Sequence, residues 1–321
     1  KNVSTSFIQK LPTSKINHRN FLQLFPYAVE QFDLSDYDLV VSSSASVAKG
    51  VLTNQDQLHI CYCHSPMRYA WDLYFDYLKD KNLSFGIKSI YARKVLHKLR
   101  TWDLLSSNRV DFFVANSEFI AKRIRKIYNR EATVIYPPVD IEDFVLEKEK
   151  QEYYVTASRL VSYKKIDIIV KAFNQMPHKI LKVVGDGPDL KKIKKISKGN
   201  IQIIGSLEKK DLIKTIQKAK AFIYAAEEDF GILPVEAQSC GTPIIAYNKG
   251  GLKETVIEGV TGVFFEKQTP SDIANAVRRF DKEEFDCNLI SKNAERFGKK
   301  RFESEFQSFV EKKIKEFNIE K

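Results

Sequence analysis

Three neighbouring acids stand between an apolar stretch and a predicted helix in the second half of the chain. Tyr224-Ala225-Ala226 runs into Glu227-Glu228-Asp229, and Gly231-Ile232-Leu233-Pro234 then indicates a helix start. A helix N-terminus offers unpaired N–H groups and the positive end of the helix dipole, which suits a phosphate. Carboxylates repel a nearby phosphate, so they are unfavourable there unless they face other groups, such as sugar hydroxyls. The spacing alone leaves two readings open: a sugar-phosphate site or a solvated acidic loop.

Two cations follow another predicted strand, at 153–157. Arg159 and Lys164 come directly after it, at the strand end where ligands of parallel sheets bind. Arginine can hold a phosphate through two parallel hydrogen bonds, and lysine supplies a mobile point charge. The pair therefore predicts a phosphate site, with two solvated surface cations as the alternative.

Glycines follow two more predicted strands. Gly185 and Gly187 lie in Gly185-Asp186-Gly187-Pro188, and Gly250-Gly251 is a similar pair. Glycine permits close approach of the backbone to a ligand. The third glycine of a dinucleotide fingerprint is absent, so a tight structural turn is the alternative reading.

His64 is the candidate functional residue of the first half. It follows a predicted strand at 58–63 and precedes Ser65-Pro66, where it can donate a hydrogen bond to a ligand oxygen. His59 and His97 are interpreted as structural.

Short apolar strands alternate with helices along the chain, which indicates parallel α/β sheets. A charged segment without apolar periodicity, at about 139–151, is the predicted linker between two such units. Two parallel units joined in this way predict an interdomain cleft that binds the ligand. The predicted strands are 38–41, 58–63, 111–115, 133–136, 153–157, 180–184, 201–204, 221–224 and 243–246. The predicted helices include 118–128, 165–175, 189–196, 209–218 and 234–240, with a helix start at Thr269.

Composition narrows the class of protein. A length of 321 residues favours two domains. The 52 Lys and Arg exceed the 41 Asp and Glu, giving a net charge of +11 that implies an anionic partner: a phosphate ligand, an anionic membrane or nucleic acid. No nucleic-acid recognition motif is present, and the acidic loop argues against that partner. The four Cys have neither a disulfide framework nor paired metal-ligand spacing, which favours a reducing cytosol.

A basic amphipathic helix is predicted from Ile87 to Trp102. Ile87, Ile90, Tyr91, Val95, Leu99 and Trp102 form its expected apolar face, and Lys88, Arg93, Lys94 and Lys98 are charged. Such a helix can lie on an anionic membrane. The alternative is an ordinary surface helix packed on its own sheet.

Together these residues resemble retaining glycosyltransferases of family 4, which adopt the GT-B fold. Glu228 and Glu236, with seven residues between them, are similar to the family's E-x7-E element. Other elements follow in the family's order: Arg159 to Lys164, Gly185-Asp186-Gly187-Pro188, Ile203-Ile204-Gly205 and Gly250-Gly251. The first half is similar to bacterial mannosyltransferases of lipopolysaccharide O-antigen assembly, through Ser42-Ser43-Ser44, His64-Ser65-Pro66-Met67, Ala115-Asn116-Ser117 and Tyr136-Pro137-Pro138.

The resemblance implies two Rossmann-like parallel-sheet domains facing a cleft. Residues 1–140 would form the acceptor-side domain and 150–299 the donor-binding domain. A helix at about 300–321 is expected to pack back on the first domain. The family's first domain begins with a strand and a glycine-rich loop, which nothing before Asp38 provides. The first domain is therefore expected to be incomplete by roughly one or two βα units, with an exposed sheet edge.

The resemblance also implies roles by position. Arg159 and Lys164 would hold the diphosphate, Glu228 would lie near the donor sugar, and Glu236 would bind the ribose hydroxyls. His64 would face the donor sugar, which makes it a fourth expected catalytic residue with Arg159, Lys164 and Glu228. The expected donor-binding residues besides Glu236 are Gly185, Gly187, Gly205, Phe230, Gly231, Ile232 and Leu233.

The implied reaction transfers a hexose, with mannose and the donor GDP-mannose favoured, to a glycan or lipid-linked acceptor in cell-surface polysaccharide synthesis. Fixed cations stabilise the charge on the leaving diphosphate. No Asp-x-Asp metal element or cofactor is expected. The expected location is the cytoplasm, with peripheral membrane contact through Ile87–Trp102. Two alternatives are a nucleotide-sugar-binding protein without turnover and a GT-B sugar-nucleotide epimerase.

Overall fold

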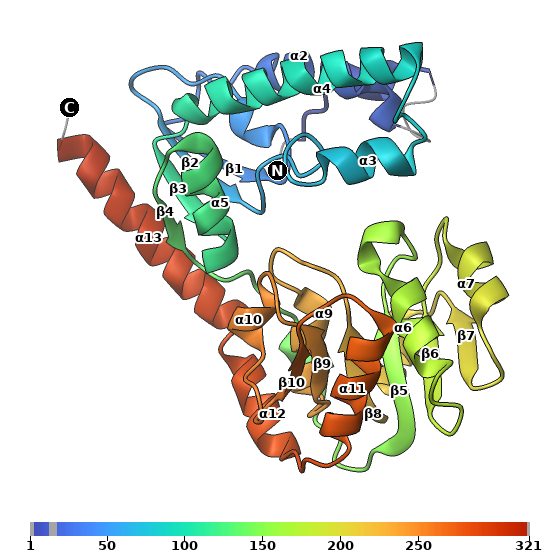
Figure 1. The fold of residues 1–321 in the computed structure, drawn as a ribbon. Coiled ribbons are helices and arrows are strands. Elements are labelled where there is room, and N and C mark those ends of the chain that lie inside the picture. Colours follow the sequence, from blue (N-terminus) through green and yellow to red (C-terminus); the bar gives the residue numbers. More distant parts are fainter. Residues whose placement is uncertain (1–2, 13–17, 320–321) are drawn as a thin grey trace. The chain divides into compact units, whose positions relative to one another are not determined.

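The computed structural model describes residues 3–12 and 18–319 and divides the chain into two compact units. Unit 1 comprises Lys1–Ile135 and Phe306–Lys321, and unit 2 comprises Tyr136–Glu305. Each unit is a parallel sheet with helices, as the alternating pattern predicts (Figure 1). Residues 320 and 321, where the last helix is expected to end, lie outside the described range.

Unit 1 contains a four-stranded parallel sheet in the order β1-β2-β3-β4. Its strands are β1 (Leu39–Ser44), β2 (Leu58–Cys63), β3 (Phe112–Ala115) and β4 (Ala132–Val134). Its α-helices are α2 (Phe25–Glu30), α3 (Tyr74–Asp80), α4 (Ile87–Ser106) and α5 (Glu118–Tyr128), and its 3-10 helices are η1 (Phe7–Lys10), η2 (His18–Leu24), η3 (Ala48–Gly50) and η4 (Ser107–Arg109).

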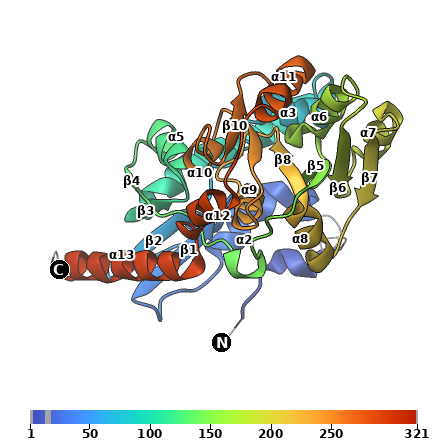
Figure 2. The same ribbon diagram turned by 90° about the horizontal axis from the view of Figure 1, so that it is seen from below.

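Alternate side chains of β2 and β3 face opposite sides of this sheet. Cys61 and Phe113 pack against α5 in one buried cluster. On the other side, the Tyr62 ring lies 5.9 Å from Phe306, and Lys313 Nζ lies 4.1 Å from the centre of the Phe112 ring. Both partners belong to α13 (Lys299–Ile319), whose C-terminal part lies beside the sheet (Figures 1 and 2). The last helix therefore packs against this face of the unit 1 sheet.

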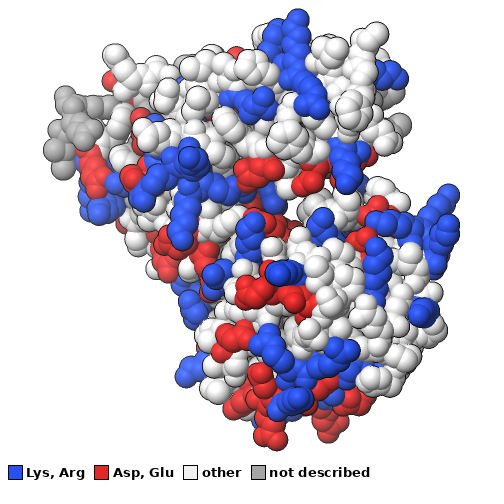
Figure 3. Space-filling model, viewed as in Figure 1, with Lys and Arg blue, Asp and Glu red and all other residues white. Residues whose placement is uncertain are grey.

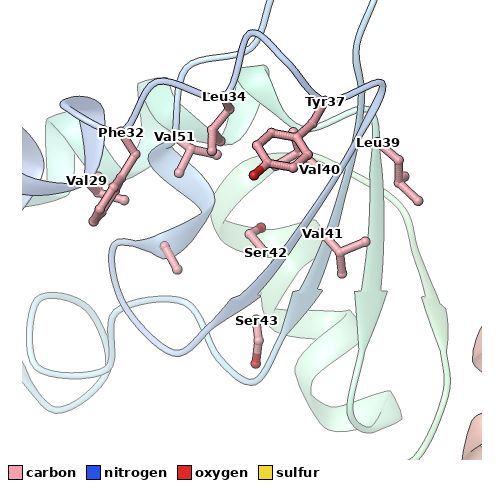
Figure 4. A pocket seen from close by; sticks show the side chains of 11 residues that line it. Val29, Phe32, Leu34, Tyr37, Leu39, Val40, Val41, Ser42, Ser43 and Val51 are labelled. Carbon is pink, nitrogen blue, oxygen red and sulfur yellow. The ribbon is translucent and has the colours of Figure 1, made fainter. Parts of the chain in front are cut away.

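An apolar pocket of about 410 Å³ lies beside β1, the edge strand of this sheet (Figure 4). Its lining comes from α2, the segment before β1, β1 itself and η3. The lining residues are Val29, Phe32, Leu34, Tyr37, Leu39, Val40, Val41, Ser42, Ser43, Ala48 and Val51. None of the residues predicted to bind a donor lies in it.

Unit 2 contains a six-stranded parallel sheet in the order β10-β9-β8-β5-β6-β7. Its strands are β5 (Gln151–Ala157), β6 (Ile180–Val184), β7 (Ile201–Gly205), β8 (Ala219–Tyr224), β9 (Ile244–Tyr247) and β10 (Gly262–Phe265). Its helices are η5 (Ile141–Asp143), η6 (Ser162–Lys164), α6 (Ile166–Phe173), α7 (Leu190–Ile196), α8 (Lys209–Gln217), α9 (Ile232–Ser239), α10 (Leu252–Thr255), α11 (Pro270–Phe280) and α12 (Cys287–Glu295), followed by the start of α13.

Helices cover both faces of the sheet in unit 2. One buried cluster joins the sheet to α6, α7 and α11, and a second joins it to α8, α9 and α10. Along β5, Tyr154 belongs to the first cluster, whereas Tyr153 and Val155 belong to the second. This burial on both faces explains why the strands read as continuous apolar runs.

The local signals in the sequence are confirmed where they rest on caps and periodicity. Helix α5 spans the predicted residues, and Ser117 Oγ accepts a hydrogen bond from the Ile120 N–H. Thr269 likewise caps α11, where its side chain accepts from the Asp272 N–H. Helix α9 begins at Ile232 rather than at Pro234. Strand β10 and helices α2, α3 and α12 were not predicted.

Candidate active site

The loops that carry the predicted donor-binding residues meet at one edge of the unit 2 sheet. Strands β8, β5, β6 and β7 are parallel neighbours, so their carboxyl ends lie side by side. Glu228 follows β8, Arg159 and Lys164 follow β5, Gly185 follows β6, and Gly205 ends β7. Segments far apart in the sequence thus form one row of loops at the strand ends, where ligands of such sheets bind.

Lys164 and Glu228 are in direct contact within this row. Lys164 Nζ donates to Glu228 Oε1 at 2.6 Å and to the Tyr224 hydroxyl at 2.9 Å. The two side chains are 16% and 17% exposed. Burial acts against the Lys164 ammonium, but Tyr224 and Glu228 outweigh it and raise the pKa of Lys164. Lys164 therefore stays charged at neutral pH.

Arg159 lies on a loop whose backbone is tied to the loop after β6. The Ser158 N–H donates to the Val184 carbonyl at 3.1 Å, and the Leu160 N–H donates to the Asp186 carbonyl at 2.9 Å. A Cβ on Gly185 would lie 1.9 Å from the Ser158 carbonyl oxygen, so only glycine allows this approach. The close approach permitted by Gly185 is thus to the Arg159 loop, and it places the exposed Arg159 beside the strand ends.

The loop from Glu228 to Ile232 ends at the N-terminus of α9. Gly231 precedes the helix with a φ of +91°, in the left-handed region that favours glycine. Because Pro234 has no N–H, the first-turn amides available to a ligand are those of Ile232 and Leu233. The Gly251 N–H donates to the Glu228 carbonyl at 2.9 Å, which holds this loop against the one after β9.

Phe230 lies in this loop with its side chain turned into the core. It is 3% exposed, and its ring lies 5.7 Å from that of Tyr136 and 5.4 Å from that of Phe297. Any contact of Phe230 with a donor would therefore come from its backbone, while its ring anchors the loop.

Glu236 lies further along α9, beside a group of charges. Burial raises the pKa of Glu236 to about 7, against the Lys209 charge, and Asp140 and Asp143 add to the rise. Lys209 Nζ lies 3.2 Å from Asp140 Oδ2 and 2.5 Å from Asp143 Oδ2. Lys209 is therefore largely engaged by these two aspartates.

His64 follows β2 in unit 1, as predicted. Its Nε2 lies 2.8 Å from Ser43 Oγ, and its ring packs edge-on against Tyr62 at 5.2 Å. Partial burial lowers the pKa of His64, so its imidazole is neutral at neutral pH and can donate one hydrogen bond. His59 is fully buried between Ser42 and the Arg109 carbonyl, which agrees with a structural role.

Two polar partners were missed by the sequence reasoning. Tyr224 contacts Lys164, and Ser43 contacts His64, in both cases through a side-chain hydroxyl. Each lies at or near the end of a strand adjacent to the one before its partner. The order of strands in the sheet was the missing signal.

The cations, the carboxylates and the helix N-terminus lie at the strand ends of one parallel-sheet unit, in a chain of two such units, which is the architecture of the GT-B fold. The chain belongs to the glycosyl transferases group 1 family, whose model matches residues 139–300. A second model, Glycosyltransferase Family 4, matches residues 4–143. The two models together match residues 4–300, which confirms the family that the motifs indicated.

The chain matches about half the length of its curated relatives. An uncharacterized glycosyltransferase of Methanocaldococcus jannaschii is 27% identical over 195 residues, 59% of this chain and 55% of the relative. A GDP-mannose-dependent monoacylated alpha-(1-6)-phosphatidylinositol monomannoside mannosyltransferase of Corynebacterium glutamicum is 29% identical over 205 residues, 51% of this chain and 54% of the relative. The chain thus spans little more than half the length of these relatives.

Solved structures share the fold at low sequence identity. Sucrose-phosphate synthase of Thermosynechococcus elongatus superposes with a TM-score of 0.69 at 18% identity, covering 95% of this chain and 80% of that one. Anabaena HepE in complex with UDP superposes with a TM-score of 0.63 at 17% identity, covering 91% and 81%. These superpositions show that the chain has the same fold as these structures.

Proposed function

We propose that the protein transfers a hexose, with mannose favoured, from a nucleoside diphosphate sugar to a glycan or lipid-linked acceptor in cell-surface polysaccharide synthesis. The observation that carries the proposal is the contact of Lys164 with Glu228 at the end of adjacent strands, next to the free N-terminus of α9. A cation, a carboxylate and free amides together suit a sugar joined to a diphosphate.

In this proposal Arg159 and Lys164 bind the diphosphate, Glu228 binds the donor sugar, and Glu236 binds the ribose. His64 faces the donor sugar from unit 1. As the bond from the anomeric carbon to the diphosphate breaks, negative charge grows on the phosphate oxygens, and fixed donors stabilise it. Two cations and a helix N-terminus can do this without a metal ion. The acceptor hydroxyl attacks from the same face, which retains the anomeric configuration.

The relatives support both a guanosine and a uridine donor. The mannosyltransferase of Corynebacterium glutamicum is GDP-mannose-dependent by its name, which favours GDP-mannose. The Anabaena HepE structures contain UDP and UDP-glucose, so a UDP-sugar is the second choice. A cytoplasmic location, where such donors are made, is part of the same proposal.

A panel of nucleoside diphosphate sugars tests the function. We expect one donor to raise the thermal unfolding midpoint and to release its nucleoside diphosphate when a glycan acceptor is added, with or without a metal chelator. Binding at 100 times the dissociation constant stabilises the folded state by about 2.7 kcal/mol. Binding without release would favour a sugar-nucleotide-binding protein, and an altered sugar without acceptor would favour an epimerase. Full activity in Glu228→Ala would contradict the role given to that carboxylate.

The burial of Glu236 predicts a pH-dependent affinity for the donor. Its raised pKa of about 7, against an ordinary 4.5, means that the folded state holds a proton between these values that the unfolded chain has lost. The free energy of unfolding therefore falls as pH rises through this window. Ribose hydroxyls donate to the ionised carboxylate, so donor binding is expected to strengthen as pH rises.

We expect the dissociation constant of the intact nucleotide sugar to fall about tenfold between about pH 6 and about pH 8. Calorimetry of the nucleotide sugar, whose diphosphate does not titrate in this range, is the measurement. The Glu236→Gln variant serves as the matched control and should bind more weakly with a flat profile. If the dissociation constant of Glu236→Gln changed with pH as it does in the wild type, the pH dependence would come from another group.

We also propose that the protein contacts an anionic membrane, but through a smaller surface than the predicted helix face. Within the described residues, no helix is long and apolar enough to cross a membrane. The C-terminal half of the predicted face is packed inside unit 1, with Leu99 2% exposed and Val95 and Trp102 against the same cluster. This part of the predicted face is therefore packed against unit 1 and is not available to a membrane.

Phe85 and the N-terminal part of α4 are exposed to solvent. Phe85 is 92% exposed, Ile87 86%, Ile90 68% and Tyr91 58%. We call these four residues the α4 tip. Exposed lysines lie near it in the sequence, namely Lys79, Lys81, Lys88 and Lys94. Figure 3 shows this part of unit 1, around α3 and α4, as uncharged surface with Lys and Arg among it. Exposed apolar groups with basic neighbours suit an anionic bilayer surface.

Sedimentation with vesicles tests the α4 tip. We expect the protein to sediment with phosphatidylcholine vesicles that contain phosphatidylglycerol. Phe85→Ser with Ile87→Ser should weaken this binding by at least about tenfold, because two apolar side chains that would enter the bilayer are lost. Leu105→Ser, which removes an exposed apolar residue at the other end of α4, is the control. Equal sedimentation of both variants would contradict the proposal.

A further inference from the structure

The ammonium of Lys164 is held by two acceptors that differ in charge. Its Nζ donates to Glu228 Oε1 at 2.6 Å and to the Tyr224 hydroxyl at 2.9 Å. The rings of Tyr163 and Tyr224 lie 5.5 and 5.4 Å from the same nitrogen. An ammonium has three N–H donors, so two are used inside the protein and one is left for a ligand.

Tyr224 is a rigid support for this nitrogen. It is the last residue of β8, it is 6% exposed, and its ring stacks on Phe222 at 6.1 Å. Lysine, by contrast, carries its charge on a flexible stem with several rotatable bonds. A hydroxyl fixed on the strand end therefore limits the positions that the ammonium can occupy.

Glu228 and Tyr224 also differ in their effect on the positive charge of Lys164. Glu228 is an anion, and its carboxylate offsets the positive charge that a diphosphate would meet. Burial, together with the Glu228 charge, raises the pKa of Tyr224, so this side chain stays a neutral phenol. A neutral acceptor can hold the ammonium without cancelling its charge. Among the described residues, Lys164 is the hydrogen-bond partner of Tyr224 Oη.

We propose that Tyr224 is a positioning residue, which fixes the Lys164 ammonium for the leaving diphosphate. This inference rests on the proposed function of the site. When the donor sugar engages Glu228, the Tyr224 hydroxyl keeps Lys164 in place, so that the remaining N–H and the full charge act on the phosphate oxygens.

The test removes the hydroxyl and keeps the ring. We expect Tyr224→Phe to lower kcat/KM for donor turnover by about ten- to a hundredfold, the range for a hydrogen bond to a charged group. Most of the loss should fall on kcat, because the charge on the phosphate grows in the transition state. In a Lys164→Met background the same substitution should cause less than a twofold further loss, since the two residues act together.

Tyr153→Phe is the matched control. It also removes a hydrogen-bonded hydroxyl from a strand of this sheet, but its partner is the Thr215 carbonyl rather than Lys164. We expect it to leave kcat/KM within twofold while lowering the unfolding midpoint as much as Tyr224→Phe does. Equal kcat/KM in wild type and Tyr224→Phe, or additive losses in the double variant, would overturn the inference.

A second readout separates this inference from the proposed function. A wild type that releases no diphosphate from any donor defeats the proposed function. The preference of the protein for a nucleoside diphosphate over the monophosphate then decides the inference, measured by calorimetry. Tyr224→Phe should reduce this preference about tenfold, and an unchanged preference would overturn the role of Tyr224.

Discussion

Replacing Lys164 with methionine is expected to lower kcat/KM for donor turnover by about 100- to 1000-fold, the cost of removing one fixed donor to a developing oxyanion. The substitution keeps an unbranched side chain that is one atom shorter and removes the charge. Lys164 is largely buried, contacts Glu228 and Tyr224, and has a raised pKa, so its charge is both permanent and fixed. Release of nucleoside diphosphate from the preferred donor is the measurement.

Lys171→Met is the control for this prediction. Lys171 lies on α6, and its ion pair with Asp167 spans 3.9 Å at the surface. We expect its kcat/KM to stay within twofold of the wild type. The unfolding midpoint of Lys164→Met must also be measured, because the variant leaves Glu228 without its cation. A folded Lys164→Met protein with more than a tenth of the wild-type kcat/KM would contradict the role of Lys164 in catalysis.

The largest expected loss of stability follows from replacing Asp103 with asparagine. Lys49 and Asp103 form a fully buried ion pair in unit 1, with Nζ 2.7 Å from Oδ1 and both side chains at most 1% exposed. Lys49 also donates to Ser106 Oγ, and Asp103 Oδ2 accepts from Trp71 and Tyr128 at 2.8 and 2.9 Å. Every charge in this cluster is therefore compensated.

Asp103→Asn leaves the Lys49 ammonium buried without a counter-charge. We expect the free energy of unfolding to fall by about 3–5 kcal/mol, the cost of breaking a buried pair from one side. The chain has two tryptophans, and both, Trp71 and Trp102, lie in unit 1. Tryptophan fluorescence during urea unfolding therefore reports on this unit alone.

Two further variants set the scale of that loss. Arg125→Ala breaks an ion pair with Glu131 in which both side chains are more than half exposed, and it should leave the free energy of unfolding nearly unchanged because water screens the pair. The double variant Lys49→Met with Asp103→Asn removes both charges and keeps an amide oxygen that can accept from Trp71 and Tyr128, so it should recover part of the stability. A loss below about 1 kcal/mol for Asp103→Asn, or a double variant less stable than it, would contradict this account.

Most strands and helices could be predicted because their signals are local. Strand β2 and helix α5 have the predicted bounds, and Ser117 and Thr269 cap their helices as expected. Strand β10 was not predicted because it has only four residues and starts with a glycine. Helix α4 was predicted with an apolar face, but the sequence did not show which part of that face is exposed. Its apolar residues look alike in the sequence, and only packing separates the buried Leu99 from the exposed Ile87.

By itself, the sequence determined which residues follow each strand, and therefore which of them reach the binding edge of a parallel sheet. This was enough to predict Arg159, Lys164 and Glu228 as site residues. Only the tertiary structure decided their partners. Lys164 meets Tyr224 across 60 residues because β5 and β8 are neighbours, and Gly185 packs on Ser158 because β6 lies on the other side of β5. Strand order depends on the burial of whole helix and sheet faces, which no short stretch of residues specifies.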